Sequence, residues 1–167
     1  MTLPQELQIF FIIITAVIAG YNVAKGKVSE QQRYLSAFSA ITCAGMIGYY
    51  FEFTAVSYND EICALKLEYL YFCFAPVFLI RFIMLYTHLK YNEIAIRVFT
   101  AYQTFIYIIV LHLKYLPGVY YKSFSILNYH GTSYIRVVPG PLYNINNLAN
   151  TSSLTSLIFL TFTRTLH

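Results

Sequence analysis

Long apolar stretches alternate with short polar ones along this chain, and the pattern is clearest at residues 65–89. Within it, residues 67–86 are apolar and aromatic apart from Glu68 near one end and Arg81 inside the run. About 20 helical residues at 1.5 Å each span ~30 Å, the hydrocarbon thickness of a bilayer. The stretch therefore predicts a membrane-spanning helix. Pro76 predicts a kink in it, either a signalling hinge or a tolerated membrane proline.

The other apolar segments extend this prediction. Together they predict spanning helices at residues 7–24, 34–57, 66–88 and 95–114. Residues 119–138 are rich in Tyr, Ile, Val and Ser on both sides of a His-Gly pair, which is typical of a β-hairpin. Residues 148–167 are rich in Ser, Thr and Leu and form either an atypical tail or a marginal fifth helix. The expected fold class is an all-α integral membrane helix bundle of four or five transmembrane helices with a small extracytoplasmic β-hairpin.

Composition and charge agree with a membrane protein. The chain is 58% hydrophobic and only 11% charged, whereas soluble domains average about 25% charged residues. Lys25, Lys27 and Arg33 follow the first apolar segment, and Lys90 and Arg97 follow the third. The positive-inside rule therefore places both loops in the cytoplasm and the N-terminus outside. No basic run suggests nucleic acid, and three scattered cysteines suggest neither a disulfide framework nor a metal site.

Four polar side chains fall near the outer ends of the predicted second to fourth helices: Glu52, Glu68, His112 and Lys114. If the helices bundle, these side chains can converge into a small polar vestibule. A histidine titrates near neutral pH, so such a cluster can sense protons or a small polar ligand. The alternative is that all four are anchors in the headgroup region.

Arg81 lies deeper, ~20 Å beyond Glu68 along the same helix. A charge inside an apolar run is costly, so Arg81 is expected to face protein and form an intramembrane polar clamp. By depth its candidate partners are Gln103, Thr42 and Asn22, and we take Gln103 as the partner in the clamp.

Small residues recur every four positions in the predicted second helix, at Ser36, Ala40, Ala44 and Gly48. Such a stripe lets membrane helices approach closely, where van der Waals packing replaces the missing hydrophobic drive. We therefore expect this face of the helix to pack against a neighbour.

Two motifs carry a family resemblance. One is Ala-Leu-Lys-Leu-Glu-Tyr at residues 64–69, followed by Pro76, and the other is Val-Pro-Gly-Pro-Leu-Tyr at residues 138–143. In their order and spacing they resemble the seven-helix membrane region at the N-terminus of many bacterial sensor histidine kinases and diguanylate cyclases. That family has a Lys-x-Glu-Tyr signature at the start of its third helix and a Gly-Pro-Leu-Tyr-like start to its fifth. Residues 1–147 are thus expected to form part of such a sensor region.

The resemblance implies a membrane-embedded signal-sensing input region of a bacterial signalling protein, in the plasma (inner) membrane. The 167 residues contain no GGDEF run, no phosphoacceptor His-Glu pair and no nucleotide-binding Gly-rich loop, so we expect no enzyme activity and no cofactor. The change of composition after residue 147 suggests a truncated gene. Expected partners are the bilayer and an unknown small extracytoplasmic ligand, and a homodimer is left open. The alternatives are a small transporter or channel-type subunit and a non-functional remnant.

Overall fold

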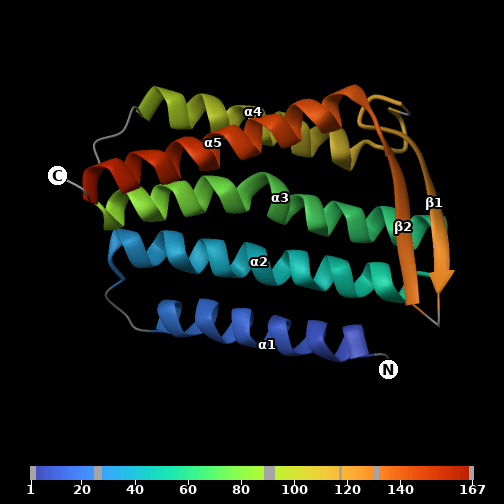
Figure 1. The fold of residues 1–167 in the computed structure, drawn as a ribbon. Coiled ribbons are helices and arrows are strands. Elements are labelled where there is room, and N and C mark those ends of the chain that lie inside the picture. Colours follow the sequence, from blue (N-terminus) through green and yellow to red (C-terminus); the bar gives the residue numbers. More distant parts are fainter. Residues whose placement is uncertain (1–2, 25–27, 89–92, 117, 130–131, 166–167) are drawn as a thin grey trace.

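The computed structural model describes residues 3–24, 28–88, 93–116, 118–129 and 132–165. In chain order, these residues form α1 (Leu3–Ala24), α2 (Glu30–Thr54), α3 (Tyr58–Tyr86), α4 (Glu93–Leu111), β1 (Tyr121–Tyr129), β2 (Thr132–Pro139) and α5 (Pro141–Thr165). Figure 1 shows the helices lying side by side as a bundle, with the β1–β2 hairpin across one end. We call this the hairpin end. α1 begins there, and α5 ends at the opposite end (Figure 1).

The third helix begins at Tyr58, earlier than the predicted start at residue 66. Ser57 caps it: the Ser57 hydroxyl accepts a hydrogen bond from the Asp60 backbone N–H (3.3 Å), and the Asp60 carboxylate accepts one from the Ser57 N–H (3.0 Å). This reciprocal cap satisfies two backbone donors that a helix start leaves free. The predicted outer loop before residue 65 is therefore helical. Lys66, with the rest of its motif, lies well inside α3 rather than at its start.

The other three predicted helices also begin earlier than predicted, and α1 begins at Leu3 instead of residue 7. α2 begins at Glu30 instead of residue 34, because Ser29 and Gln32 form the same kind of capping box. α4 runs from Glu93 to Leu111, against the predicted 95–114. In each case the apolar run marks the helix, and polar residues at its edge decide where it starts.

The hairpin prediction is confirmed as a two-stranded antiparallel sheet. Its register runs from Tyr121 opposite Pro139 to Tyr129 opposite Thr132, with an irregularity between Tyr121 and Ser123. The predicted turn at residues 130–131 lies outside the described residues. The sheet crosses the ends of α3 and α2 in Figure 1, and β2 contacts α2.

Of the two alternatives for the C-terminal residues, the structure has a helix, which continues to Thr165. Pro141 occupies its first position, where the missing N–H needs no partner. The preceding residue ties this start to the chain before β1, because the Gly140 N–H donates to the Tyr120 carbonyl (2.8 Å). A Cβ at position 140 would lie 2.6 Å from that carbonyl oxygen, so only glycine fits this approach.

Length and composition identify two candidate membrane spans among the described helices, α3 and α4, where the sequence pattern predicts four or five. α1 contains a shorter apolar stretch, Gln5–Tyr21. Large apolar side chains such as Phe10, Val17, Val98 and Phe105 are exposed along α1 and α4. Exposed apolar surface of this extent is typical of contact with lipid or with other helices.

α3 is the central helix and carries most of the core. At the hairpin end, Leu65, Tyr69 and Cys73 pack against Ile106 and Val110 of α4 and against the chain entering β1. α2 and α3 approach closely at two glycines of α2. A Cβ on Gly45 would lie 2.5 Å from the Tyr71 Cβ, and one on Gly48 would lie 2.8 Å from the Glu68 nitrogen.

The prediction that the small-residue face of α2 packs against a neighbouring helix is therefore confirmed only in part. Gly48 lies against α3 as expected, but Ala40 is exposed. The other side of α2 packs on α1, where the Cys43 thiol contacts the Ile12 carbonyl oxygen (3.7 Å). Because α2 lies between two helices, two of its faces are buried instead of one.

Candidate functional site

Three glutamates of α2 and α3 lie near the hairpin end and interact electrostatically: Glu52, Glu61 and Glu68. Glu61 is 0% exposed and Glu68 is 4% exposed. The Glu68 side chain hydrogen-bonds to that of Glu52, and both glutamates of α3 interact electrostatically with Glu52. A carboxylate offers only acceptors, so a hydrogen bond between two carboxyl groups requires one of them to hold a proton. We call Glu52 and Glu68 the carboxyl pair.

Glu61 is the least satisfied member of this group. Among the described residues, neither of its carboxyl oxygens has a hydrogen-bond partner, and one oxygen of Glu68 is also unpartnered. A buried polar group without a partner carries a desolvation cost of about 1–3 kcal/mol, and more when it is charged. The group is therefore sensitive to any proton or cation that reaches it.

The tight helix contact at Gly48 places the carboxyl pair. The Glu68 Cγ would lie 2.9 Å from a Cβ at position 48, so its side chain lies directly against the α2 backbone. Glu52 follows Gly48 by one helical turn and so lies on the same face of α2. Tyr49 is close enough to interact with both carboxyl groups. The small residue in α2 therefore makes room for the acidic one in α3.

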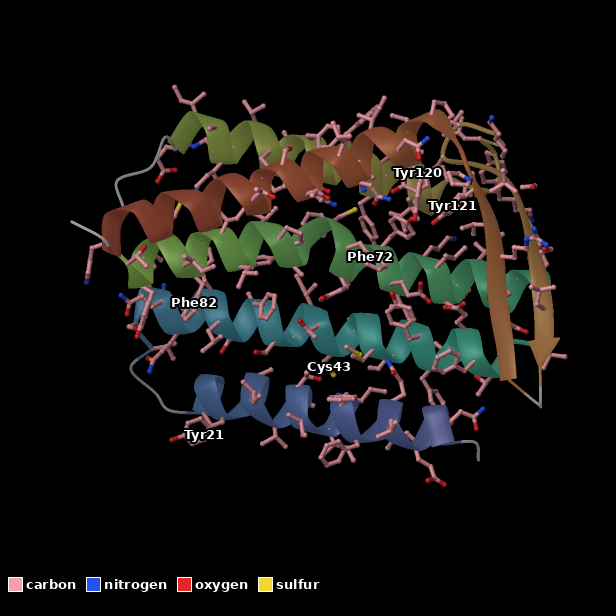
Figure 2. The ribbon with its side chains drawn as sticks, viewed as in Figure 1. Tyr21, Cys43, Phe72, Phe82, Tyr120 and Tyr121 are labelled. Carbon is pink, nitrogen blue, oxygen red and sulfur yellow. The ribbon has the colours of Figure 1, made fainter. Side chains whose placement is uncertain are left out.

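A cluster of tyrosines lies beside the carboxyl pair and joins three elements. Tyr69 of α3 packs edge-to-face on Tyr120, with ring centroids 5.1 Å apart, and its hydroxyl hydrogen-bonds to that of Tyr121 in β1. Asn146 of α5 donates to the Tyr120 hydroxyl (3.0 Å). Figure 2 shows Tyr120 and Tyr121 between α3 and the start of the hairpin. We call Tyr69, Tyr120, Tyr121 and Asn146 the tyrosine cluster.

The hydroxyls of this cluster stay protonated at neutral pH. Burial raises the pKa of Tyr120 to about 12, and burial also raises the pKa of Tyr121. Neutral phenols both donate and accept hydrogen bonds. The cluster is therefore a stable polar connection between α3, β1 and α5, and not a set of titrating groups.

The predicted vestibule of four residues forms only in part. His112 and Lys114 are exposed, and the His112 Nδ1 contacts the Ile108 carbonyl oxygen of its own helix (2.8 Å). Only Glu52 and Glu68 come together. Sequence reasoning missed Glu61, although it precedes Glu68 by two helical turns on one face, because the start of the helix was placed after it.

Arg81 forms a clamp with a different partner from the one predicted. Its two terminal nitrogens each lie 3.1 Å from a carboxylate oxygen of Glu93 in α4. Gln103 instead donates to Asn150 of α5 (2.6 Å). Since Gln103 is ~15 Å further along α4 than Glu93, it lies beyond the reach of Arg81. The other candidates do not replace it: Thr42 donates to the Phe38 carbonyl of its own helix, and the Asn22 side chain lies outside the described residues.

Two sequence predictions remain: that the chain has no metal site, and that Pro76 is either a signalling hinge or a tolerated membrane proline. Among the described residues, no group of three His, Cys, Asp or Glu side chains is arranged to hold a metal ion. Pro76 lies within α3, where it lines a cavity shared with α2 and α5.

Comparison with known protein families gives a match that covers nearly the whole chain. The family model described as the N-terminal 7TM region of histidine kinase matches residues 7–167. The match continues past residue 147, where the sequence resemblance ended. No curated protein and no solved structure matches the chain.

Proposed function

The chain belongs to the family of N-terminal 7TM regions of histidine kinases, and we propose that it is the input region through which such a kinase receives a signal at the membrane. The family description supports a histidine kinase output rather than a diguanylate cyclase. In this proposal the chain lies in the bacterial plasma membrane. The N-terminus and the hairpin lie outside, and the far end of α5 faces the cytoplasm.

Charge supports this orientation. Lys25, Lys27 and Arg33 follow α1, and Lys90 and Arg97 follow α3. α1 and α3 end, and α2 and α4 begin, at the end of the bundle opposite the hairpin (Figure 1). Because short cytoplasmic loops are enriched in Lys and Arg, the hairpin end is outside. Lys114, Lys122 and Arg136, which follow α4, are exceptions, but the five basic residues cited for the other end outnumber them.

The carboxyl pair is the receiving site of this proposal. The observation that carries it is the approach of the buried Glu68 side chain to Glu52 at the close contact of Gly48, beside the buried Glu61. The hydrogen bond between the two carboxyl groups exists only while the pair holds a proton. When the proton leaves, two carboxylates repel each other across the contact at Gly48, where there is no free space. The ends of α2 and α3 must then separate. The signal proposed is therefore a change in outside proton concentration.

The tyrosine cluster provides a route from this site to α5. Tyr69 follows Glu68 directly in α3 and hydrogen-bonds to Tyr121, and Asn146 ties α5 to the adjacent Tyr120. A movement of α3 at the carboxyl pair therefore changes contacts at the start of α5. That helix runs to the end of the bundle where a kinase would connect (Figure 1).

The test is a fusion of the full chain to the histidine kinase domain of a family member, through the helices that follow in that protein. Autophosphorylation is measured in vesicles with the outside pH varied between about 5.5 and 8.5. We expect the wild-type fusion to change activity across this range and Glu68→Gln to abolish the change, since an amide keeps the hydrogen bond at every pH. Glu6→Gln, at an exposed carboxyl group on α1, is the matched control and should respond like wild type.

His112→Ala separates this proposal from the four-residue vestibule. An exposed His112 away from the carboxyl pair predicts a response like that of wild type. A pH response that survives Glu68→Gln but disappears in His112→Ala would overturn the carboxyl pair as the receiving site.

A further inference from the structure

A cavity of about 280 Å³ lies between α2, α3 and α5, apart from the carboxyl pair. Its walls are apolar where Phe38 of α2 and Phe72, Ala75 and Leu79 of α3 line it. Its α5 side is polar, with Asn147 and Asn150. None of the residues that line it is charged. The cavity thus offers an apolar compartment with hydrogen-bonding groups on one side.

The cavity lies deep along the bundle. Pro76, which also lines it, is ~12 Å beyond Glu68 along α3 and ~15 Å before the end of that helix. Phe72 is 38% exposed and Asn147 is exposed, so the cavity opens to the surroundings of the helices. At this depth in a candidate spanning helix, the open side of the cavity faces lipid or a neighbouring helix within the bilayer. A ligand would therefore enter from the bilayer and not from the outside solution.

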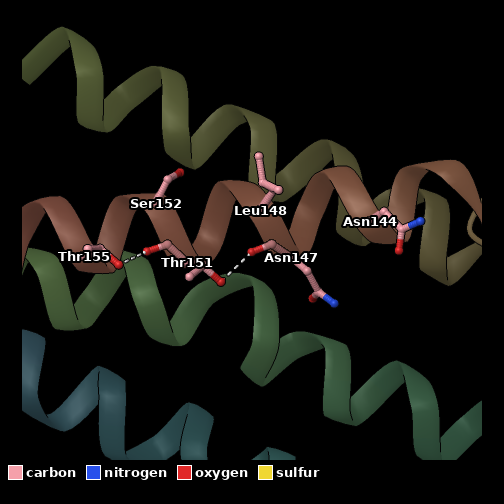
Figure 3. Close-up of a pocket in the computed structure, with 6 residues that line it drawn as sticks. All are labelled: Asn144, Asn147, Leu148, Thr151, Ser152 and Thr155. Carbon is pink, nitrogen blue, oxygen red and sulfur yellow. Dashed lines mark hydrogen bonds between the residues drawn. The ribbon is translucent and has the colours of Figure 1, made fainter.

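The polar side of the cavity has free hydrogen-bonding capacity. Asn150 accepts the hydrogen bond from Gln103 through its oxygen, and its amide nitrogen keeps two donors. Among the described residues, no hydrogen bond occupies that nitrogen or the Asn147 carboxamide. The Phe72 backbone carbonyl is a further acceptor. Because Pro76 has no N–H, it cannot donate the helical hydrogen bond that this carbonyl would otherwise accept. Figure 3 draws a neighbouring pocket along α5, which shares Asn147 and Thr151 with this cavity; Asn147 is directed to the α3 side of α5, and Leu148 and Ser152 lie on the other side.

We propose that this cavity is a second ligand site, which binds a small uncharged amphiphile from the bilayer. Its apolar chain or ring packs on the phenylalanines, and one hydroxyl or carbonyl group hydrogen-bonds to Asn147 or Asn150. The volume of about 280 Å³ lies just below the ~300–1,000 Å³ typical of small-molecule sites, which fits a medium-chain alcohol or ketone but not a phospholipid. This inference goes beyond the proposed function and does not depend on the carboxyl pair.

The chemistry of the cavity favours this occupant over a lipid acyl chain. An acyl chain satisfies the apolar walls but leaves both carboxamides facing hydrocarbon. An amide without a hydrogen bond in such a medium costs several kcal/mol. An occupant with one polar group removes that cost while filling the same volume.

Photolabelling of the full chain in lipid nanodiscs tests the proposal. The probe is an octanol that carries a diazirine, and adducts are located by mass spectrometry after digestion. We expect adducts on residues 72–79 of α3, suppressed about tenfold by excess octanol and little changed by excess octane. In Thr151→Trp a bulky ring on a cavity-lining residue should reduce these adducts about tenfold. Ser152→Trp, the same change on the next residue outside the cavity, should leave them unchanged.

A second pair of variants tests the polar contact. Asn147→Leu should weaken octanol competition several-fold, whereas Asn144→Leu, on the same helix but outside the cavity, should not. Neither variant changes Gln103 or Asn150, so the hydrogen bond between these two side chains is present in both. Equal competition by octanol and octane would mean that an acyl chain fills the cavity. Equal labelling of wild type and Thr151→Trp would mean that the probe contacts only the outer surface of α3. Either result would overturn the proposal while leaving the pH response unaffected.

Discussion

The contact between α2 and α3 at Gly48 gives the sharpest prediction. A Cβ there would lie 2.8 Å from the Glu68 nitrogen, closer than real Cβ contacts, and 3.0 Å from the Ala64 carbonyl oxygen, at the tight end of real ones. Both atoms belong to the backbone, so they cannot rotate away, and Gly48→Leu must force the helices apart. Overpacking typically costs about 1–3 kcal/mol, and this site belongs at the upper end. Leucine regains ~1 kcal/mol of helix propensity, so the net loss is ~2 kcal/mol.

A matched control isolates the steric part of this loss. Gly20 of α1 has nothing within 4 Å of an added Cβ, so Gly20→Leu gains the same propensity without the clash. The two variants should differ by ~3 kcal/mol. At ~2–4 °C per kcal/mol for a chain of this size, their melting temperatures differ by roughly 6–12 °C. Val56→Leu, at a 91% exposed residue outside the helices, should behave like wild type.

The assay is thermal unfolding of purified variants in one detergent. Unfolding is monitored through the reaction of a fluorogenic maleimide with the buried Cys73 thiol, in a background where the exposed Cys63 is replaced by serine. Equal melting temperatures for Gly48→Leu and Gly20→Leu would refute the close approach of α2 to α3. The arrangement of the carboxyl pair would then also be wrong, because it depends on that contact.

The remaining predictions concern topology, the Arg81 clamp and catalysis. In intact cells, a membrane-impermeant maleimide should label a cysteine replacing Ser125 but not one replacing Ser29; the reverse pattern would invert the topology. Glu93→Gln should lower the melting temperature by ~2–4 °C, because it removes the charge from an ion pair whose acid is half exposed, worth about 1 kcal/mol. A double-mutant cycle with Arg81→Gln measures that coupling, and a value near zero would contradict the clamp. The purified chain should neither autophosphorylate with ATP nor form a cyclic dinucleotide from GTP, and incorporation of radiolabel in either assay would contradict the input-region proposal.

Much of the fold is local and was therefore predictable. The apolar run around Pro76 predicts a long helix because burial or lipid contact favours it whatever its neighbours are. The alternation of β-branched and aromatic residues before and after residues 130–131 predicts two paired strands. Gly140-Pro141 predicts the start of a helix, since proline fits only its first turn. Each of these signals depends on residues that are neighbours in the chain.

Helix starts were less predictable because they depend on single polar contacts. The hydrogen bonds of Ser57 with Asp60 extend α3 towards the hairpin end, into a segment whose composition resembles a loop. That extension adds Glu61 to the helix and to the face that carries Glu68. An error of two turns in a helix boundary was thus enough to hide one member of the candidate site.

The pairing of side chains between helices was decided by the tertiary structure alone. Arg81 meets Glu93 rather than Gln103 because the register of α3 against α4 depends on packing along their whole length. Glu52 meets Glu68 while His112 does not, because Gly48 brings α2 against α3 at that level. The sequence by itself determines which residues are costly to leave in lipid. Which of them satisfy one another depends on distances between segments far apart in the chain, and only the packed bundle sets those distances.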